Sequence, residues 1–367
     1  MFAAAFGAAL CATLAAPALA SVATTLFRIA DSRIAEASGI APGRVSPGVV
    51  YMQNDSGDTN RFFALDVRTG ATAATVTVTG ARNVDWEDIA VGPGAGGRSS
   101  VWLADTGDNT AGRDEVQVYR VAEPRLPAGR SGVPIRTAKA DIWRLRYPGG
   151  AVDAESLAVA PDGTAYIFTK TLGTSTVYRL PARPDADRVQ TLHRVGQVPL
   201  LPTGTANPFG LAGQVTATGA SISSDGRLLV VRTYADAYVW RLRDADVATA
   251  LRGPPVRAAL PEQPQGEGIC VRDGRLLLSS EGVHSAVLAV PVPPGAPPAG
   301  AATSRASATT SSTPPTSVAR PTSDAATSVA TPTSARPSGH PSWVGPGLGV
   351  AAVALLGAAW LLVRRRR

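Results

Sequence analysis

A short apolar segment introduced by small or acidic residues recurs five times along the chain. The copies are Glu36–Ala41, Trp86–Val91, Ala154–Val159, Gly219–Ser223 and Gly266–Val271. A second apolar run follows each copy after a turn that contains glycine, and these runs are Val49–Met52, Val101–Ala104, Ala165–Phe168, Leu228–Val231 and Leu276–Ser279. Paired apolar runs around Asp-Gly turns are typical of β-hairpins, and no helical periodicity competes with them.

Each predicted hairpin is followed by further strand-like segments. Third strands with alternating β-branched and aromatic residues are Phe62–Val67, Val116–Val121, Thr176–Leu180, Ala237–Leu242 and Ala286–Val290. Candidate fourth strands are Thr72–Thr79, Thr137–Tyr147, Thr191–Val198 and Val256–Leu260. Repeats of four antiparallel strands are typical of blades that close into a ring, so we predict an all-β protein with a five-bladed β-propeller.

The fifth repeat has no fourth strand of its own after Val290. An unassigned strand-like segment, Thr24–Ile29, lies at the other end of the repeat region. We predict that this segment completes the fifth blade, so that the two ends of the propeller pair and lock the ring. A six-bladed alternative requires a further blade between Leu200 and Gln214.

The N-terminal segment, residues 1–20, is a run of small and apolar residues that ends in an A-x-A pattern. This pattern is typical of a signal peptide, and we expect cleavage before Ser21. The run is too short to span a bilayer, which argues against a membrane anchor at this end.

Three segments of contrasting composition follow the predicted propeller, residues 21–292. Residues 293–341 are rich in Ser, Thr, Pro and Ala, which predicts a disordered stalk. Residues 342–363 are long and apolar enough for a transmembrane helix, and the basic tail 364–367 places the C-terminus in the cytoplasm by the positive-inside rule. We therefore expect a propeller outside the cell, held at the cell membrane by a single-pass helix.

Most of the net charge of +7 belongs to arginines of the stalk and tail. The nearly neutral propeller lacks the basic surface that nucleic acid binding requires, so we expect no nucleic acid partner and a monomer. Cys11 leaves with the signal peptide, so Cys270 has no partner for a disulfide and is expected to be a buried thiol.

Polar residues cluster where the first strand of a blade begins and the second strand ends. In an antiparallel blade both points lie at one axial face, and charged groups crowded there are typical of sites for small polar ligands or metals. The acidic residues at or before first strands include Glu36, Asp85, Glu87, Asp88, Asp153, Glu155 and Glu267. The predicted ligand-binding residues are Glu36, Asp55, Glu87, Asp105, Arg113, Glu155, Lys170, Arg232, Tyr234, Glu267 and Glu281.

A structural interpretation competes with this functional one. Asp and Asn at strand ends favour turns through local hydrogen bonds. Acidic side chains there also tie neighbouring blades together when they accept backbone N–H groups.

Two acidic loops offer several hard oxygen donors, as calcium requires. The candidate metal ligands are Asp55, Asp58, Asp105, Asp108 and Asn109. Neither loop has EF-hand spacing. Zinc is disfavoured because only His193, His284 and one cysteine are available in the propeller. No G-x-S-x-G motif is present, and the sequence assigns no catalytic residue.

The order of these motifs resembles the SdiA-regulated family of exported five-bladed propellers, in particular an actinobacterial-type membrane-anchored branch. The motifs that carry the resemblance are Glu36–Gly39, Asn54–Gly57, Asp85–Ile89, Asp105–Asn109 with Arg113, Asp153–Leu157, Thr169–Lys170, Arg232–Tyr234 and Gln265–Ile269. The resemblance implies a five-bladed ring and bound calcium, and it implies no settled reaction.

Three functions are compatible with these features. The first is a cell-surface binding module for a small polar or envelope-derived ligand, with calcium at the axial face. The second is a calcium-dependent hydrolase of the phosphoesterase, phytase-like or lactonase-like kind. The third is a scaffold for protein partners.

Overall fold

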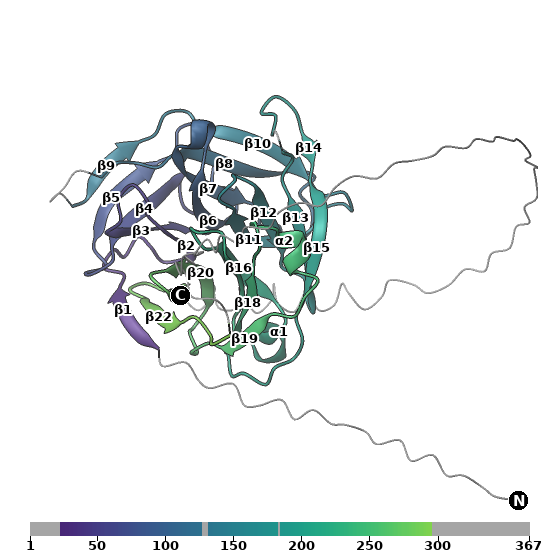
Figure 1. Cartoon of the computed structure of the whole chain (residues 1–367). Helices are drawn as coiled ribbons and strands as arrows, with labels where there is room; N and C mark the ends of the chain where they lie inside the picture. Colours follow the sequence, from purple (N-terminus) through teal and green to yellow (C-terminus); the bar gives the residue numbers. More distant parts are fainter. Residues whose placement is uncertain (1–22, 127–130, 183, 296–367) are drawn as a thin grey trace, which may run out of the picture. The chain divides into compact units, whose positions relative to one another are not determined.

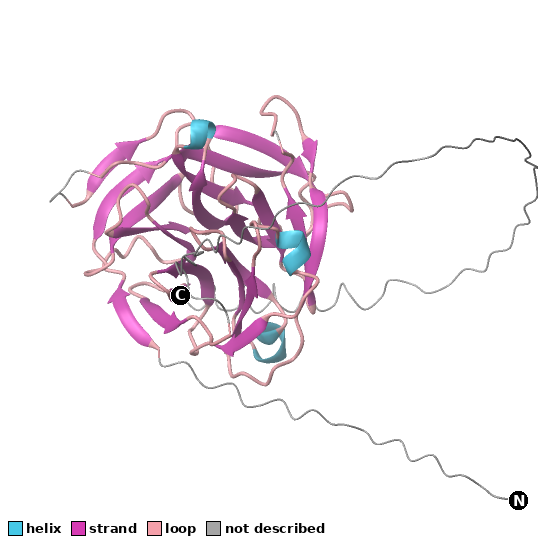
Figure 2. Ribbon diagram, in the orientation of Figure 1, coloured by secondary structure: helices cyan, strands magenta, loops and turns pink. Residues whose placement is uncertain are grey.

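Strands form almost all of the regular structure in the described part of the chain. This part, in a computed structural model, comprises residues 23–126, 131–182 and 184–295 (Figures 1 and 2). The innermost strands are β2 (Ala37–Pro42), β6 (Trp86–Pro93), β11 (Ala154–Val159), β16 (Ala217–Ile222) and β20 (Gly266–Arg272). The second strands are β3 (Val49–Asn54), β7 (Ser99–Asp105), β12 (Ala165–Thr169), β17 (Leu228–Thr233) and β21 (Arg275–Ser280).

Two more strands complete the core of each sheet. The third strands are β4 (Arg61–Asp66), β8 (Val116–Ala122), β13 (Thr174–Arg179), β18 (Asp236–Arg241) and β22 (Ala286–Pro291). The fourth strands are β5 (Thr72–Thr77), β10 (Asp141–Arg146), β15 (His193–Pro199), β19 (Val256–Ala259) and, from the N-terminus, β1 (Thr24–Arg28). We number the sheets blades 1 to 5 in the order of their inner strands.

The five inner strands contact one another in a closed cycle, from β2 through β6, β11 and β16 to β20 and back to β2. Figure 1 shows the sheets arranged around this common centre. The described residues therefore form a five-bladed β-propeller, as the repeats predict.

The ring closes through the two ends of the propeller, and this prediction is also confirmed. β1 pairs antiparallel with β22, with Thr24 opposite Ala289 and Arg28 opposite Ala286. The Nδ1 atom of His284 lies 2.9 Å from the carbonyl oxygen of Ile29 and extends the contact beyond the strands. The N-terminal strand thus supplies the fourth strand of blade 5.

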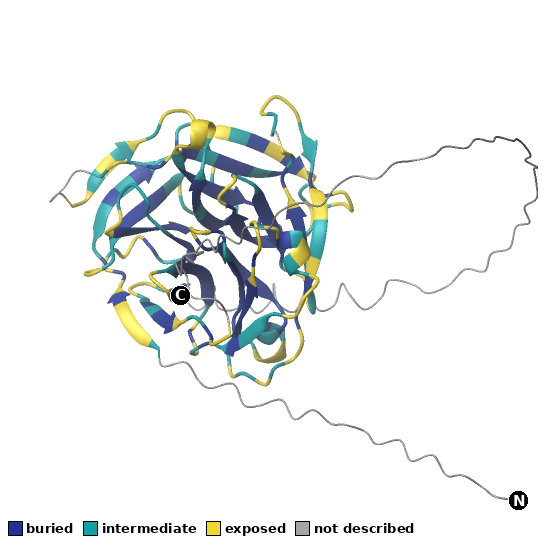
Figure 3. Cartoon of the chain, viewed as in Figure 1, coloured by how far each residue is buried: buried dark blue, intermediate teal, exposed yellow. Residues whose placement is uncertain are grey.

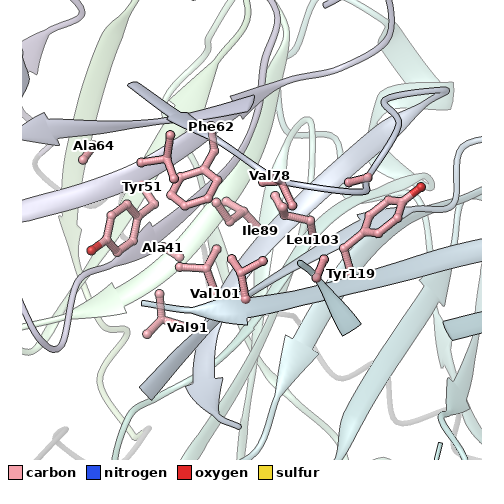
Figure 4. Close-up of a cluster of buried hydrophobic side chains, with 14 of the residues drawn as sticks. Ala41, Tyr51, Phe62, Ala64, Val78, Ile89, Val91, Val101, Leu103 and Tyr119 are labelled. Carbon is pink, nitrogen blue, oxygen red and sulfur yellow. The ribbon is translucent and has the colours of Figure 1, made fainter. Parts of the chain in front are cut away.

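Five apolar clusters fill the spaces between neighbouring blades. The cluster between blades 1 and 2 includes Tyr51, Phe62 and Tyr119 (Figure 4). Cys270 is buried in the cluster that joins blade 5 to blade 1. Burial is greatest on the inner strands and falls toward the rim (Figure 3). Because each cluster takes side chains from two blades, the blades stabilise one another.

Two strands were not expected from the sequence. Blade 1 has a fifth strand, β9 (Val133–Arg136), parallel to β5, and blade 2 has a fifth strand, β14 (Gln190–Thr191), parallel to β10. The segment that the six-bladed alternative required, Leu200–Gln214, contains a loop and the short helix α1 (Gly210–Gln214) instead of a blade. The remaining helices are α2 (Val247–Ala250) and one turn of 3-10 helix at Ala95–Gly97.

The predicted signal peptide, stalk, transmembrane helix and basic tail lie outside the described residues. Among the described residues, none belongs to a helix with the length and apolarity that crossing a membrane requires.

Candidate functional site

Every inner strand begins with a β-bulge. The pairing register between inner and second strand shifts near the start of the inner strand, for example between Ala37 and Gly39 in blade 1. A bulge bends the strand and redirects the extra side chain. The extra residues are Ser38, Glu87, Glu155, Thr218 and Glu267. Three glutamates, from blades 2, 3 and 5, therefore occupy equivalent positions at one axial face.

Two more side-chain positions per blade lie at this face. The backbone joins them, since the Asp55 N–H donates to the Glu36 carbonyl at 3.0 Å and the Lys170 N–H donates to the Asp153 carbonyl at 2.9 Å. The residues directly before the inner strands are Glu36, Asp85, Asp153, Thr216 and Gln265. The residues directly after the second strands are Asp55, Thr106, Lys170, Tyr234 and Glu281. Blade 4 contributes no carboxylate at these positions, whereas each of the other blades does.

Carboxylates from blades 1, 2 and 3 converge in two overlapping triads. Asp55, Asp85 and Glu87 form one triad, and Glu87, Asp153 and Glu155 form the other. Within each triad, one oxygen of every residue lies within 4.8 Å of the others. Glu87 belongs to both triads and so lies between two candidate cation positions. Cations that bond to oxygen at about 2.3–2.6 Å fit triads of this size.

The crowding of these acids changes their titration. Burial is the main cause that raises the pKa of Asp55 to about 6. Burial together with the charge of Asp55 raises the pKa of Asp85 to about 8. Burial and neighbouring carboxylates raise the pKa of Glu87 and of Glu155 well above the ordinary range. The cluster therefore retains protons at neutral pH unless a cation replaces them.

Lys170 is the lysine at this face, and it forms an ion pair with Glu155. Burial lowers the pKa of Lys170, but the neighbouring acids Glu155 and Glu267 outweigh burial and raise it above its usual value. Lys170 is therefore a cation at neutral pH, but a single ammonium group cannot neutralise the whole cluster, so the other acids keep protons unless a further cation binds.

Glu267 connects the cluster to blade 4. Its side chain is buried, and its Oε1 accepts a hydrogen bond of 3.1 Å from the Tyr234 hydroxyl. Its Oε2 is buried without a hydrogen-bond partner among the described residues. The charge of Glu267 also raises the pKa of Glu155 and Glu281, so this carboxylate lies close enough to the cluster to interact with it. A buried carboxylate oxygen without a hydrogen-bond partner is typical of a position where an ion or a water binds.

Arg232 lies behind Glu267 with no exposed surface. Its Nη1 donates to the carbonyl oxygens of Gly268 and Ser279 at 3.0 and 3.2 Å. Its charge, together with that of Lys170, opposes the effect of burial on the pKa of Glu267. Arg232 is thus placed to support Glu267 and the inner strands rather than to touch a ligand.

Gly107 is required by close packing in the loop after β7. A Cβ atom at this position would overlap Glu87 Oε1 and the carboxylate of Asp85. Sequence reasoning did not single out this glycine, although it lies in the middle of the Asp105–Asn109 motif. Any side chain here would displace the first triad.

The other predicted metal ligands lie outside the triads. Asp58 forms an ion pair of 2.8 Å with Arg61, and Asp105 forms one of 3.0 Å with Arg113. Asp108 accepts the backbone N–H groups of Gly112 and Arg113 at 2.8 Å each, and Asn109 is exposed. Of the five predicted ligands, Asp55 is the one that the described residues include in a carboxylate triad.

Asp88 serves the structural role that the sequence left as an alternative. It is almost fully buried, and its Oδ1 and Oδ2 accept the N–H groups of Ile89 and Leu157 at 2.8 Å each. Leu157 belongs to the inner strand of blade 3. Asp88 therefore ties two blades together through backbone hydrogen bonds.

A recess lies at the opposite end of the axis, where the inner strands finish. It has a volume of about 180 Å³ and is lined by Pro42, Arg44, Ser224, Val271 and Arg272, among others. No triad of potential metal ligands lies there among the described residues. The chemistry therefore favours the carboxylate face as the functional one.

Comparison with known proteins identifies no family for this chain. No protein-family model matches the chain, and the search of curated proteins found no match. Among solved structures, a PQQ-bound aldose sugar dehydrogenase from Streptomyces coelicolor is 12% identical, with a TM-score of 0.39 over 76% of this chain and 99% of the other. Virginiamycin B lyase from Staphylococcus aureus is 12% identical, with a TM-score of 0.34 over 69% and 65%. A luciferin-regenerating enzyme is 12% identical, with a TM-score of 0.38 over 70% and 92%.

The names of these proteins describe enzymes, and similarity at this level does not transfer their reactions to this chain. The resemblance to the SdiA-regulated family stays a prediction from short motifs.

Proposed function

We propose that this protein is a binding module that holds calcium in its axial carboxylate triads and, with it, a small polar ligand beside Lys170. One observation carries the proposal: five carboxylates of three blades form two triads that share Glu87. Burial of the unpartnered Glu267 Oε2 beside them supports it independently.

Calcium suits the residues that are present. Asp55, Asp85 and Glu87 would hold one ion, and Glu87, Asp153 and Glu155 would hold a second. These ligands are all carboxylate oxygens, which hard cations prefer, and the triads contain neither histidine nor cysteine. A bound cation would supply the positive charge that the cluster lacks and a binding point for the oxygen atoms of a ligand.

The test is a calorimetric titration of the chelator-treated protein with calcium. We expect the Glu87→Gln variant to lose at least about tenfold in affinity, because both triads lose a charged ligand. Glu115→Gln is the matched control, since Glu115 pairs with Arg144 outside the triads. Equal calcium affinity in the two variants, or no calcium binding by the wild type, would contradict the proposal.

Nothing among the described residues favours the hydrolase alternative. His193 is exposed on the outer strand β15, and His284 contacts the Ile29 carbonyl at the ring closure. Neither histidine lies in the carboxylate cluster, so a general base at this face would have to be one of the carboxylates. The scaffold alternative would be supported by a chain that binds no calcium and no small ligand.

We also propose that the propeller is exported and held at the cell membrane by residues 342–363. Signal-like and membrane-spanning patterns at the two ends of the sequence support this location. Protease treatment of intact cells that carry the protein with a tag after residue 367 tests this location. Loss of the propeller with a protected tag is expected, and a protected propeller would contradict the proposal.

A further inference from the structure

Exposed apolar side chains gather at the face that carries the carboxylates. In the described ranges, the large apolar residues with substantial exposure are Leu26, Val84, Leu172, Leu201, Leu211 and Val283. Leu26 lies on the outer strand β1. The others lie in the connections at the carboxylate end of the blades, since Val84 precedes Asp85, Leu172 follows Lys170 and Val283 follows Glu281. Leu211 belongs to the short helix α1 within one of these connections.

The longest of these loops, residues 200–216, connects blade 3 to blade 4 and contributes two of the apolar side chains. Leu201 and Leu211 are 68% and 62% exposed. Backbone hydrogen bonds of 2.9 Å join Gly173, in the turn after Lys170, to Leu200 and to Val215. The loop therefore lies beside Lys170 at the carboxylate face.

An aromatic contact continues this apolar surface to the cluster itself. The ring of Phe209, in the same loop, lies 4.4 Å from the ring of Tyr234. The Tyr234 hydroxyl donates to Glu267. The buried Tyr234 side chain, 7% exposed, thus contacts both this loop and the carboxylate cluster.

Hydrogen bonds within the loop and to Asp236 of β18 fix the position of its backbone. The fully buried Asp236 accepts from the hydroxyls of Thr203 and Thr205 at 2.6 and 2.9 Å and pairs with Arg257 at 2.6 Å. Gln214 Oε1 accepts the Thr203 N–H at 2.8 Å. Because the apolar side chains are presented on a fixed backbone, a ligand would spend little free energy on ordering them.

The polar side chains of the axial face are also distributed unevenly, and the uncharged ones lie on the same side as the apolar residues. Blade 4 contributes Thr216, Thr218 and Tyr234 to the face and no carboxylate, and Lys170 of blade 3 is next to it. A ligand at the triads therefore has acidic groups on four blades and an uncharged, partly apolar side toward blade 4.

We propose that the ligand is a single-chain amphiphile with an anionic oxygen head, either a phosphate or a carboxylate. Its head would bind the cation of the triads and Lys170, and its hydrocarbon chain would lie against Leu172, Leu201, Phe209 and Leu211. This inference rests on the proposed function for the cation. Without calcium the carboxylates would repel the head.

Alkyl phosphates of increasing length, used below their micelle concentration, test the proposal by calorimetry with calcium present. Each additional methylene group that is buried should raise the affinity up to about fourfold until the apolar surface is covered. Inorganic phosphate should bind weakly, and chelation of calcium should abolish binding of every member of the series.

The double variant Leu201→Ser, Leu211→Ser should flatten the dependence on chain length while its calcium affinity stays that of the wild type. Leu26→Ser is the control, since it removes an exposed leucine from the rim, and it should keep the full dependence. Equal affinity for butyl and dodecyl phosphate in the wild type would overturn the inference and leave calcium binding intact.

Two further probes separate the remaining cases. Alkyltrimethylammonium ions of the same lengths that bind as well as the phosphates would overturn the anionic head. Binding to vesicles that contain phosphatidic acid, without binding to soluble alkyl phosphates, would overturn the single-chain ligand. Absence of calcium binding itself would instead contradict the proposed function.

Discussion

Glu87 and Asp88 are consecutive residues of β6, yet their carboxylates serve different parts of the molecule. Glu87 is shared by both carboxylate triads at the axial face. Asp88 is directed inward, where its Oδ2 accepts the N–H of Leu157 from the next blade at 2.8 Å. The register shift between Trp86 and Asp88 separates the two side chains, because a bulge redirects the extra residue.

These different roles predict that replacing Asp88 and replacing Glu87 change the free energy of unfolding in different directions. Asp88→Asn should lower the free energy of unfolding by about 1–3 kcal/mol, because the amide has a single oxygen and leaves one of the two buried backbone N–H groups without an acceptor. Glu87→Gln should leave the stability of the calcium-free protein unchanged or higher, because it relieves repulsion within the cluster. Urea denaturation in the presence of a chelator measures both changes. A larger loss of stability in Glu87→Gln than in Asp88→Asn would contradict these roles.

Calcium binding should strengthen as the pH rises. The pKa values of Asp55 and Asp85 are raised to about 6 and about 8, so protons occupy the triads in the neutral range and must leave when calcium binds. We expect the affinity to increase from pH 6 to pH 8, with proton release on binding. Titrations in two buffers of different ionisation enthalpy quantify the released protons, and a pH-independent affinity would contradict the expectation.

The calcium-free protein should show the opposite trend in stability. A carboxyl whose pKa is higher in the folded than in the unfolded chain binds more protons when folded, so stability decreases as the pH rises. For Asp85 this decrease extends from its unfolded value of 3.8 to about 8. Melting temperatures with chelator should therefore fall over this range, and added calcium should restore stability most at the alkaline end. A rising melting temperature in chelator would argue against a strained acidic cluster.

Ring closure by the N-terminal strand gives a prediction with an adjacent control. Phe27 of β1 is 5% exposed in the cluster between blades 5 and 1, whereas Leu26 is 36% exposed. Phe27→Ala should cost about 3–5 kcal/mol because it leaves a cavity, and Leu26→Ala should change the stability by about 0.5 kcal/mol or less. Denaturation followed by tryptophan fluorescence compares them. Equal effects would mean that β1 contributes little to closure.

Much of the fold could be predicted because the repeats carry a local signal. The apolar runs and Asp-Gly turns marked the inner hairpins, and the unpaired Thr24–Ile29 indicated how the ring closes. The fifth strands β9 and β14 were missed because parallel pairing at a blade edge depends on long loops and leaves no alternating pattern of its own.

The site was harder to predict, because a bulge shifts a register without any mark in the sequence. From the sequence, Glu36 belongs with Glu87 and Glu155 among the acidic residues at or before first strands. The pairing instead places Ser38 at the position of these two glutamates. Arg232 is charged, which led to its prediction as a ligand-binding residue. The structure shows that its side chain is fully buried and donates to backbone carbonyls.

The most direct test of the cation site is anomalous diffraction from crystals saturated with calcium, at a long wavelength where calcium scatters anomalously. The triads predict anomalous peaks about 2.3–2.6 Å from the carboxylate oxygens of Glu87, one on the side of Asp55 and Asp85 and one on the side of Asp153 and Glu155. Crystals with no peak beside Glu87, or with calcium only at Asp58 or Asp108, would contradict the proposal.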